Sequence, residues 1–468
     1  MSVFREYDVR GIADRDLTDP FVYGLGRALG DLLRKRGDSA CYVGQDVRVS
    51  SPRLVKALSA GLQAADIAVR VIAPGPTPLT YYLASGGFDG KGDPEFPSKS
   101  GIMITGSHNP GEYNGFKMVI AGTTLHGPDI QALQAPTEKY QAQAPSDMPA
   151  APEAIDYHSK YVKEIQGTLN VSRPLHVVVD AGNGAGWRLG VEFYEALGCQ
   201  VTPLFCTPDG TFPNHHPDPT VPKNLEQLIA KVKEVGADVG IAFDGDADRI
   251  GAVSATGRIL FGDQLVLYYA RDILKEIPHA TIISEVKSSQ VLYDTLAEWG
   301  AKPIIWKTGH SLIKAKLKET HAALAGEMSG HMFFAHRFLG FDDAIYAGGR
   351  LLEGMSQHPN ETLDQFLDSL PPAINTPELR VDTEDDKKFG IVDEFIKKAK
   401  ALYGDDVLDI DGARVKMHGG WGLIRASNTQ PVLVLRFEAP NRELLGKIRD
   451  EFAGLLKDID SSVVVPEA

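Results

Sequence analysis

A weak internal repeat most constrains the fold of this 468-residue chain. Each copy has the pattern of an apolar strand, a polar loop, a helix and a second strand, and the copies occupy residues 41–78, 175–210 and 280–311. Such a unit joins parallel strands, and a spacing of roughly 100 to 130 residues between copies matches the length of a domain. We therefore predict three related α/β domains with mixed, mostly parallel sheets.

The segment beyond residue 370 lacks the repeat and predicts a different, smaller domain. Helical patterns at 389–404 and 442–459 flank short strand patterns, which is typical of an α+β unit. Linker-like composition at 142–154 and 370–382, and a softer boundary expected just past Asp248, divide the chain. The predicted domains are 1–148, 149–253, 254–369 and 370–468. Loops at the carboxyl ends of parallel strands gather on one side, so we expect the four domains to surround one cleft.

Composition excludes several classes of partner. A net charge of −14 disfavours a general nucleic-acid or membrane surface, since either would select for excess Lys and Arg. Cys41, Cys199 and Cys206 lack metal-binding spacing, so we expect reduced thiols in a cytoplasmic protein. The first residues are charged too early for a signal peptide, and no apolar run is long enough to span a bilayer. The Gly-, Pro- and charge-rich stretch 85–100 predicts a mobile surface loop.

One serine is presented at the end of a buried strand pattern. In the stretch GIMITGSHNPGEYNGFKM, residues 101–118, the apolar run Ile102–Ile104 is followed by polar turn residues that end the strand. Gly106 permits a sharp turn, so the hydroxyl of Ser107 would project from the carboxyl end of the strand. An ordinary surface turn is the alternative, because Ser, Asn and Pro are common turn residues.

Three carboxylates alternate in a second loop. Asp244, Asp246 and Asp248 lie between two apolar runs, and alternate residues of an extended loop point the same way. They could therefore converge on one hard cation such as Mg²⁺. A helix-loop-helix calcium site is ruled out by spacing, because its glycine and glutamate positions hold Arg249 and Ala255. A solvated acidic turn remains the alternative.

Two further loops have the composition of ligand sites. The stretch GEMSGH, residues 326–331, offers a carboxylate and a hydroxyl between glycines, and RASNTQ, residues 425–430, offers a guanidinium, two hydroxyls and an amide before a strand pattern. The second set suits a phosphate. Each stretch taken alone is also compatible with a turn that binds nothing.

Taken together, these four loops resemble those of the α-D-phosphohexomutases, in particular the phosphomannomutase/phosphoglucomutase branch, over essentially the whole chain. The resemblance implies the same four domains, a phosphoryl group on Ser107, and Mg²⁺ held by Ser107, Asp244, Asp246 and Asp248. The implied catalytic residues are Ser107, Arg10, His108, Lys117, Arg249, His310 and His331. The implied substrate-binding residues are Tyr7, Lys287, Glu327, Ser329, His331, Arg425, Ser427, Asn428 and Thr429. Glu327 and Ser329 would hold two sugar hydroxyls, and Arg425 would hold the phosphate that does not react.

The resemblance also implies the reaction. The enzyme would interconvert the 1- and 6-phosphates of mannose and glucose through a 1,6-bisphosphate intermediate, with glucose or mannose 1,6-bisphosphate as activator. The expected partners are small hexose phosphates, and the expected state is a monomer or weak dimer. A phosphoglucosamine mutase and a non-catalytic phosphosugar-binding protein are the alternatives; the intact Ser107 and three aspartates count against the second.

Overall fold

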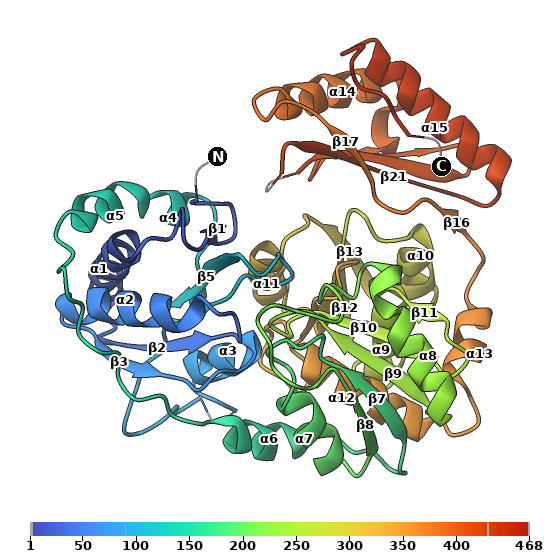
Figure 1. The fold of residues 1–468 in the computed structure, drawn as a ribbon. Helices are drawn as coiled ribbons and strands as arrows, with labels where there is room; N and C mark the ends of the chain where they lie inside the picture. Colours follow the sequence, from blue (N-terminus) through green and yellow to red (C-terminus); the bar gives the residue numbers. More distant parts are fainter. Residues whose placement is uncertain (1–2, 89, 428–429, 467–468) are drawn as a thin grey trace.

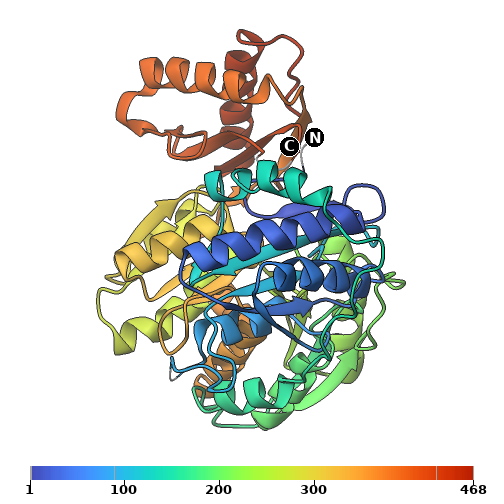
Figure 2. The same ribbon diagram turned by 90° about the vertical axis from the view of Figure 1, so that its left-hand side faces the viewer.

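The computed structural model describes residues 3–88, 90–427 and 430–466, and within them the chain forms four β-sheets with helices packed on them (Figure 1). The first sheet and its helices lie on the left of Figure 1, the second and third lie side by side on the right, and the fourth lies above them. The view in Figure 2 likewise places the fourth sheet, with its two helices, at one end of the molecule.

The first sheet has six strands and lies among five helices. Its order is β1-β5-β4-β2-β3, and β6 pairs with β5. The strands are β1 (Val9–Ile12), β2 (Ala40–Gln45), β3 (Ala68–Val71), β4 (Gly101–Ile104), β5 (Tyr113–Ile120) and β6 (Thr123–Thr124). The helices are α1 (Asp19–Lys35), α2 (Ser51–Ala64), α3 (Thr77–Ser85), α4 (Pro128–Gln131) and α5 (Gln134–Gln141).

The second sheet has the order β11-β10-β9-β7-β8 and the third has the order β13-β12-β14-β15. The strands of the second are β7 (His176–Asp180), β8 (Gln200–Leu204), β9 (Val239–Phe243), β10 (Ile250–Ser254) and β11 (Ile259–Leu260). Its helices are α6 (His158–Gln166), α7 (Leu189–Ala196), the 3₁₀ turn η1 (Pro222–Leu225) and α8 (Glu226–Val235).

The strands of the third sheet are β12 (Thr281–Glu285), β13 (Lys302–Trp306), β14 (Leu324–Gly326) and β15 (Met332–Phe334). Its helices are α9 (Gly262–Glu276), α10 (Gln290–Glu298), α11 (His310–Thr320), α12 (Ala344–Gln357) and α13 (Leu363–Ser369).

The predicted repeat is present in the topology of these three sheets. In each, one strand (β2, β7 or β12) has parallel neighbours on both sides, and the third parallel strand (β4, β9 or β14) is followed by an antiparallel strand (β5, β10 or β15). The sheets are therefore mixed, with a parallel part in each repeat and antiparallel strands added at one side. This confirms the predicted α/β class.

The fourth sheet is antiparallel and smaller. Its order is β16-β21-β20-β19-β18, and β17 pairs with β21. The strands are β16 (Ile374–Asn375), β17 (Leu379–Asp382), β18 (Val407–Leu408), β19 (Ala413–Met417), β20 (Gly420–Ala426) and β21 (Val432–Ala439). The helical elements are α14 (Lys388–Tyr403), the 3₁₀ turn η2 (Gly404–Asp406) and α15 (Arg442–Lys457), so the two predicted helices form and the α+β prediction is confirmed.

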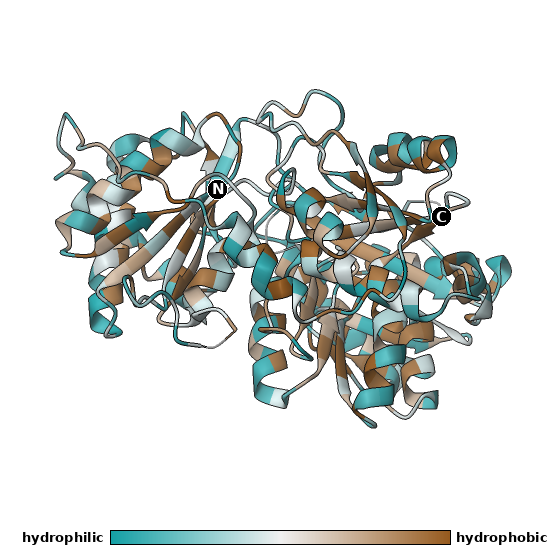
Figure 3. Ribbon diagram, turned by 90° about the horizontal axis from the view of Figure 1, so that it is seen from below, coloured by the Kyte–Doolittle hydropathy of each residue, from teal (hydrophilic) through white to brown (hydrophobic). Residues whose placement is uncertain are grey.

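The first three repeats share a hydrophobic core, whereas the fourth sheet has a core of its own. One buried cluster is continuous through the first three repeats and includes Tyr42, Phe193 and Phe334, and the first sheet has a second cluster of its own. The fourth sheet has a separate core around Phe395 and Phe452. Hydrophobic residues concentrate on the strands, and hydrophilic residues on the outer helix faces (Figure 3). The first three repeats are therefore packed as one body, to which the fourth sheet is added.

The segment 85–100, predicted as a mobile surface loop, is exposed at many of its described residues, as a surface loop should be, but it is anchored to the first sheet near its end; its mobility stays a prediction. Phe96 is buried, with its ring centroid 4.9 Å from that of Tyr42 and with the Arg70 guanidinium 4.5 Å above it. The Ser98 hydroxyl donates to the backbone carbonyl of Ala40 at 2.7 Å. Composition alone could not reveal these anchors, because one buried aromatic side chain is enough to hold a loop against a core.

Among the described residues, no helix combines the length and the apolar character that crossing a bilayer requires.

Candidate active site

Three of the predicted loops occupy the same place in the repeat. Each connects the third parallel strand to the antiparallel strand that follows it: the serine loop lies between β4 and β5, the aspartate loop between β9 and β10, and the GEMSGH loop between β14 and β15. These connections begin at the carboxyl ends of parallel strands, where ligand loops gather in α/β folds. The repeat thus explains why three unlike motifs meet.

The hydroxyl of Ser107 points at the aspartate loop. It donates to Asp244 Oδ2 at 2.8 Å, and His108 Nδ1 lies 3.2 Å from Ser107 Oγ. The backbone of Ser107 has φ 50°, a left-handed conformation that is unusual outside glycine, and its N–H donates to Thr105 Oγ1 at 2.8 Å. Burial and the positive side chains of Arg249, Arg10 and Lys117 lower the pKa of His108 well below its usual value, so this imidazole is neutral.

The three aspartates converge and are fully buried. Carboxylate oxygens of Asp244, Asp246 and Asp248 all lie within 4.8 Å of one another. Lys117 Nζ lies 2.7 Å from Asp246 Oδ2 and also contacts Asp248, and Thr77 donates to Asp246. Lys117 and Thr77 come from the first repeat, so this cluster joins the first two repeats around charged groups.

This donor set fits a hard divalent cation. Burial, with the negative charges of Asp246 and Asp248, raises the pKa of Asp244 well above its usual value. Asp246 Oδ1 is buried and has no hydrogen-bond partner within the described ranges. Oxygen ligands of this kind are those that Mg²⁺ prefers. The predicted metal loop therefore has the geometry that its motif requires.

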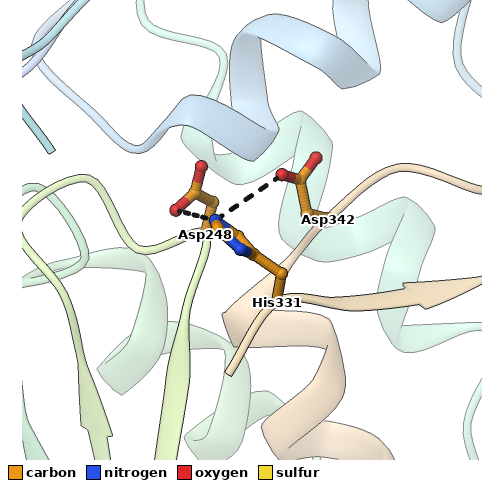
Figure 4. A group of neighbouring side chains, drawn as sticks. All are labelled: Asp248, His331 and Asp342. Carbon is orange, nitrogen blue, oxygen red and sulfur yellow. Dashed lines mark ion pairs between the residues drawn. The ribbon is translucent and has the colours of Figure 1, made fainter. Parts of the chain in front are cut away.

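His331 connects the aspartate loop to the GEMSGH loop (Figure 4). Its Nε2 lies 3.3 Å from Asp248 Oδ1 and 4.0 Å from Asp342 Oδ2, and its Nδ1 lies 2.9 Å from Glu327 Oε2. Burial would lower the pKa of this imidazole, but the charge of Asp248 and hydrogen bonds to Asp248 and Glu327 raise it to about 9. Without a cation in the cluster, the two carboxylates thus favour the protonated imidazole, against the opposing charge of Arg249, whose Nε lies 3.3 Å from Nε2.

Glu327 already has partners on both oxygens. Besides His331, its carboxylate accepts a hydrogen bond from the Gly309 backbone N–H at 2.7 Å, at the start of α11. The next residue, His310, is buried; its Nδ1 lies 3.6 Å from Asp342 Oδ2 and makes no hydrogen bond to the part of the chain that is described. Burial and the positive side chains of Lys314 and Lys117 lower the pKa of His310 well below its usual value. The two histidines thus differ in charge although their ring centroids are 5.7 Å apart.

The predicted phosphate loop is joined to the third repeat through Asp411. Arg425 donates to this carboxylate with Nε at 3.1 Å and Nη2 at 3.3 Å, and the Thr308 backbone N–H donates to it at 3.0 Å. Tyr7 donates to the carbonyl of the same Thr308 at 2.9 Å. Thr308 is therefore a junction between the first, third and fourth sheets.

Other predicted site residues lie nearby, and two cannot be placed. Lys287 Nζ is 3.2 Å from Glu378 Oε2 and 3.5 Å from Glu285 Oε1, and Arg10 pairs with Asp8. Arg249 Nε lies 3.3 Å from His331 Nε2. Ser427, the residue after β20, is buried, and its hydroxyl accepts a hydrogen bond from the Gln430 N–H at 3.2 Å. Asn428 and Thr429 lie outside the described residues.

These contacts form one continuous path between the ends of the site. Ser107 contacts Asp244, Asp248 approaches His331, His331 contacts Glu327, Glu327 binds the Gly309 N–H, and the adjacent Thr308 reaches Arg425 through Asp411. A cavity of about 550 Å³ between α10 and the fourth sheet is lined by none of the predicted site residues. The path of contacts, and not that cavity, defines the candidate site.

Comparison with known proteins agrees with the order of these parts along the chain. Models of phosphoglucomutase/phosphomannomutase domains I, II, III and the C-terminal domain match residues 1–144, 156–257, 261–374 and 378–455. A phosphomannomutase/phosphoglucomutase of Pseudomonas aeruginosa is 45% identical over 99% of this chain and 97% of its own length. The chain belongs to the phosphoglucomutase/phosphomannomutase family. This confirms the resemblance and the four-domain fold; the exact domain limits stay predictions.

Two more relatives of this phosphohexomutase agree with the assignment. A phosphoglucomutase of Neisseria meningitidis is 42% identical over 97% of this chain and 96% of its own length. The crystal structure of a phosphoglucomutase/phosphomannomutase family protein from Burkholderia thailandensis superimposes with a TM-score of 0.90, at 42% identity and 99% coverage of both chains. The prediction of an enzyme of this family is therefore confirmed.

Sequence reasoning missed several residues of this phosphohexomutase that contact the predicted site. Thr77 reaches Asp246 from 169 positions away, Asp342 approaches both histidines, and Asp411 holds Arg425. None of them lies in a motif with chemical content of its own. They become visible only in the folded chain: Thr77 reaches from the first repeat to the second, Asp411 also binds the Thr308 N–H of the third repeat, and Asp342 meets the two histidines within the third repeat.

Proposed function

We propose that this chain is a phosphohexomutase that interconverts mannose 1-phosphate with mannose 6-phosphate, and glucose 1-phosphate with glucose 6-phosphate, in the cytoplasm. The observation that carries the proposal is the hydroxyl of Ser107, which donates to Asp244 within a buried cluster of three aspartates and one lysine. A serine at the edge of a cation site is placed to accept and return a phosphoryl group. Membership in the phosphoglucomutase/phosphomannomutase family supports this chemistry.

The reaction has two phosphoryl transfers in opposite directions. In the first, the P–O bond to Ser107 Oγ breaks, a P–O bond to the free sugar hydroxyl forms, and the hydroxyl proton passes overall to Ser107 Oγ. The product is a 1,6-bisphosphate. After this intermediate turns over in the cleft, the other phosphoryl group returns to Ser107 and the proton returns to the sugar. A hexose 1,6-bisphosphate would therefore also load an unphosphorylated enzyme.

Charge placement around Ser107 supplies the catalysis. Asp244, Asp246 and Asp248 would hold Mg²⁺, which when bound neutralises charge on the transferring phosphoryl group. Lys117 and Arg249 add fixed positive charge beside it. His108, neutral and 3.2 Å from Ser107 Oγ, can accept the proton of that hydroxyl. His331, the last residue of GEMSGH, and the neighbouring His310 are the proposed groups that exchange a proton with the reacting sugar hydroxyl.

The other end of the substrate would be held by the third and fourth sheets. Glu327 and Ser329 are proposed to bind the 3- and 4-hydroxyls, and Lys287, Arg425 and Ser427, with Asn428 and Thr429, to bind the phosphate that does not react. Arg425 already presents Nε and Nη2 to a carboxylate, the geometry in which a guanidinium also binds phosphate. Asp411 would orient this fork while the phosphate occupies its remaining donors.

A panel of sugar phosphates tests this proposal. Mannose and glucose differ only at C2, so if the site binds the 3- and 4-hydroxyls alone, their 1-phosphates should turn over within about a hundredfold of each other. Galactose 1-phosphate has its 4-hydroxyl inverted and should be far slower than both, because sites that hydrogen-bond a hydroxyl discriminate by up to about 10⁴ when it is misplaced. Coupled assays with a bisphosphate activator measure this. Efficient turnover of galactose 1-phosphate, or preferred turnover of glucosamine 1-phosphate, would contradict the assigned sugars.

A further inference from the structure

The side chain of Arg48 is buried directly beneath the serine loop. Arg48 follows β2 in the first repeat, and its side chain has no exposed surface. A guanidinium has five N–H donors, and here each has an acceptor. Nε donates to Asp46 Oδ2 at 3.1 Å, Nη1 donates to the carbonyls of Pro110 and Tyr113 at 2.5 and 3.0 Å, and Nη2 donates to those of Ser107 and Asn109 at 2.7 and 2.6 Å.

Four of these acceptors are backbone carbonyls of the serine loop and its end. Three belong to the turn between β4 and β5 that carries Ser107, and the fourth belongs to Tyr113, the first residue of β5, so one planar group holds the carbonyls of residues 107, 109, 110 and 113 at fixed separations. The contact is tight: a Cβ atom on Gly106 would lie 2.5 Å from Arg48 Cζ. This bracing matches the strained φ of Ser107, since a left-handed serine persists only where its surroundings over-determine it.

The Ser107 carbonyl, one of the four that Arg48 binds, also contacts the aspartate loop. A Cβ atom on Gly245 would lie 2.3 Å from the carbonyl oxygen of Ser107, so the backbone between Asp244 and Asp246 passes directly against it. The Ser107 carbonyl is thus fixed by Arg48 and in contact with the metal loop. Movement of the guanidinium would change the separation between Ser107 Oγ and the three carboxylates.

The second repeat covers Arg48. The guanidinium carbon lies 5.0 Å from the centroid of the Phe212 ring, a cation–π arrangement. A Cβ atom on Gly210 would lie 2.6 Å from Arg48 Cα. The segment that supports the serine loop is therefore packed against the domain that carries the aspartates.

We propose that Arg48 is a positioning residue for phosphoryl transfer: by holding four carbonyls of the serine loop, it sets the position of Ser107 Oγ against the cation site. The contacts of Arg48 within the described residues include none of those assigned to the sugar or to the phosphate that does not react, so we expect its effect to fall on the transfer step and not on substrate binding. Lysine keeps the charge but has one nitrogen with three donors and cannot bridge the same set. This inference rests on the proposed role of Ser107.

Arg48→Lys separates this role from a general structural one. A displacement of about 1 Å at a reacting group can cost about 100-fold, so we expect kcat with glucose 1-phosphate to fall by about that factor while KM stays within about threefold. Loading of Ser107 by glucose 1,6-bisphosphate, followed by intact mass against time, should slow by the same factor. The matched control is Arg350→Lys, which alters another buried arginine that donates to a carbonyl, that of His336, and should behave like the parent.

The outcomes that overturn the inference are distinct from failure of the proposed function. A kcat within about threefold of the parent, a change in KM alone, or an equal loss in Arg350→Lys would each refute the role of Arg48, even if Ser107 is phosphorylated. If Arg48→Lys does not fold, Phe212→Leu provides the test, because it removes only the aromatic cover of the guanidinium. It should lower kcat several-fold at constant KM, and an unchanged kcat would refute the role.

Discussion

The two ends of the site are built in different ways. At the reacting end, Ser107, Lys117 and the three aspartates are buried between repeats that share one hydrophobic core. At the distal end, Arg425 belongs to a domain with its own core, which meets the third repeat through polar contacts such as Thr308–Asp411 and Lys287–Glu378, and through a small cluster of Val286, Trp421 and Leu423.

This difference matches the two tasks of the enzyme. Phosphoryl transfer needs groups held in place before the substrate arrives, because charge must be stabilised where it develops. Under the proposed assignment, the distal end must instead bind either the 1-phosphate or the 6-phosphate of the same sugar. A domain that packs separately can adjust to both, whereas the buried cluster at the reacting end cannot. Substitutions at the first end should therefore change kcat, and those at the second should change KM.

The largest effect is expected at the serine. Ser107→Ala should fold like the parent and lose nearly all mutase turnover, by more than about 1000-fold, because the proposed mechanism passes the phosphoryl group through the Ser107 hydroxyl. Coupled turnover of glucose 1-phosphate measures this. Ser59→Ala is the matched control: it alters a buried serine of the same domain whose hydroxyl has no hydrogen-bond partner in the described ranges. Turnover of Ser107→Ala within about tenfold of the parent would exclude a phosphoserine mechanism.

The second effect concerns the cation. Asp244→Asn should lower kcat by about 100- to 1000-fold, since a bound cation contributes several kcal/mol to stabilising charge in the transition state. Thermal unfolding provides a readout that does not depend on activity: Mg²⁺ should raise the Tm of the parent, and the variant should lose this increase. Full activity of the parent in excess chelator would show that the aspartates do not hold a required metal.

At the distal end the effect should be smaller and of another kind. Arg425→Ala removes charged hydrogen bonds worth about 1.5 to 3 kcal/mol, so kcat/KM should fall by about 10- to 150-fold, mainly through KM. Arg449→Ala, on the helix α15, is the control in the same domain. If Arg425→Ala lowers kcat with an unchanged KM, the contrast between the two ends is wrong.

The smallest expected effect is a pH dependence of stability at His331. Its pKa of about 9 in the folded chain exceeds the usual 6.5, so its contribution is fully present below pH 6.5 and is lost as pH rises through 9. Urea unfolding in chelator should show that His331→Asn costs up to about 3 kcal/mol at pH 6 and much less at pH 9.5. An equal cost at both pH values would mean that His331 is not held as a cation.

The sequence predicted the secondary-structure elements and the motif loops, but not the residues that support those loops. The strand-loop-helix-strand pattern and the two C-terminal helical patterns predict the elements, because hydrophobic period and chain order determine them locally. The loops that carry Ser107, Asp244 and Glu327 are found because their side chains have recognisable chemistry. Arg48 and Asp411 are not found, since their partners include the backbone of other segments, Ser107 O for one and the Thr308 N–H for the other. A backbone group carries no residue identity, so such contacts leave no mark in a sequence.

The most direct test of the account is the phosphorylation of Ser107 during turnover. Purified protein is loaded with glucose 1,6-bisphosphate, its intact mass and the modified peptide are determined, and glucose 1-phosphate is then added in a single turnover. The account predicts one phosphoryl group on Ser107, its transfer to the sugar at a rate at least equal to kcat, and no loading of Ser107→Ala. An active enzyme whose Ser107 stays unmodified throughout, or whose phosphoserine is not discharged by the sugar phosphate, would contradict it.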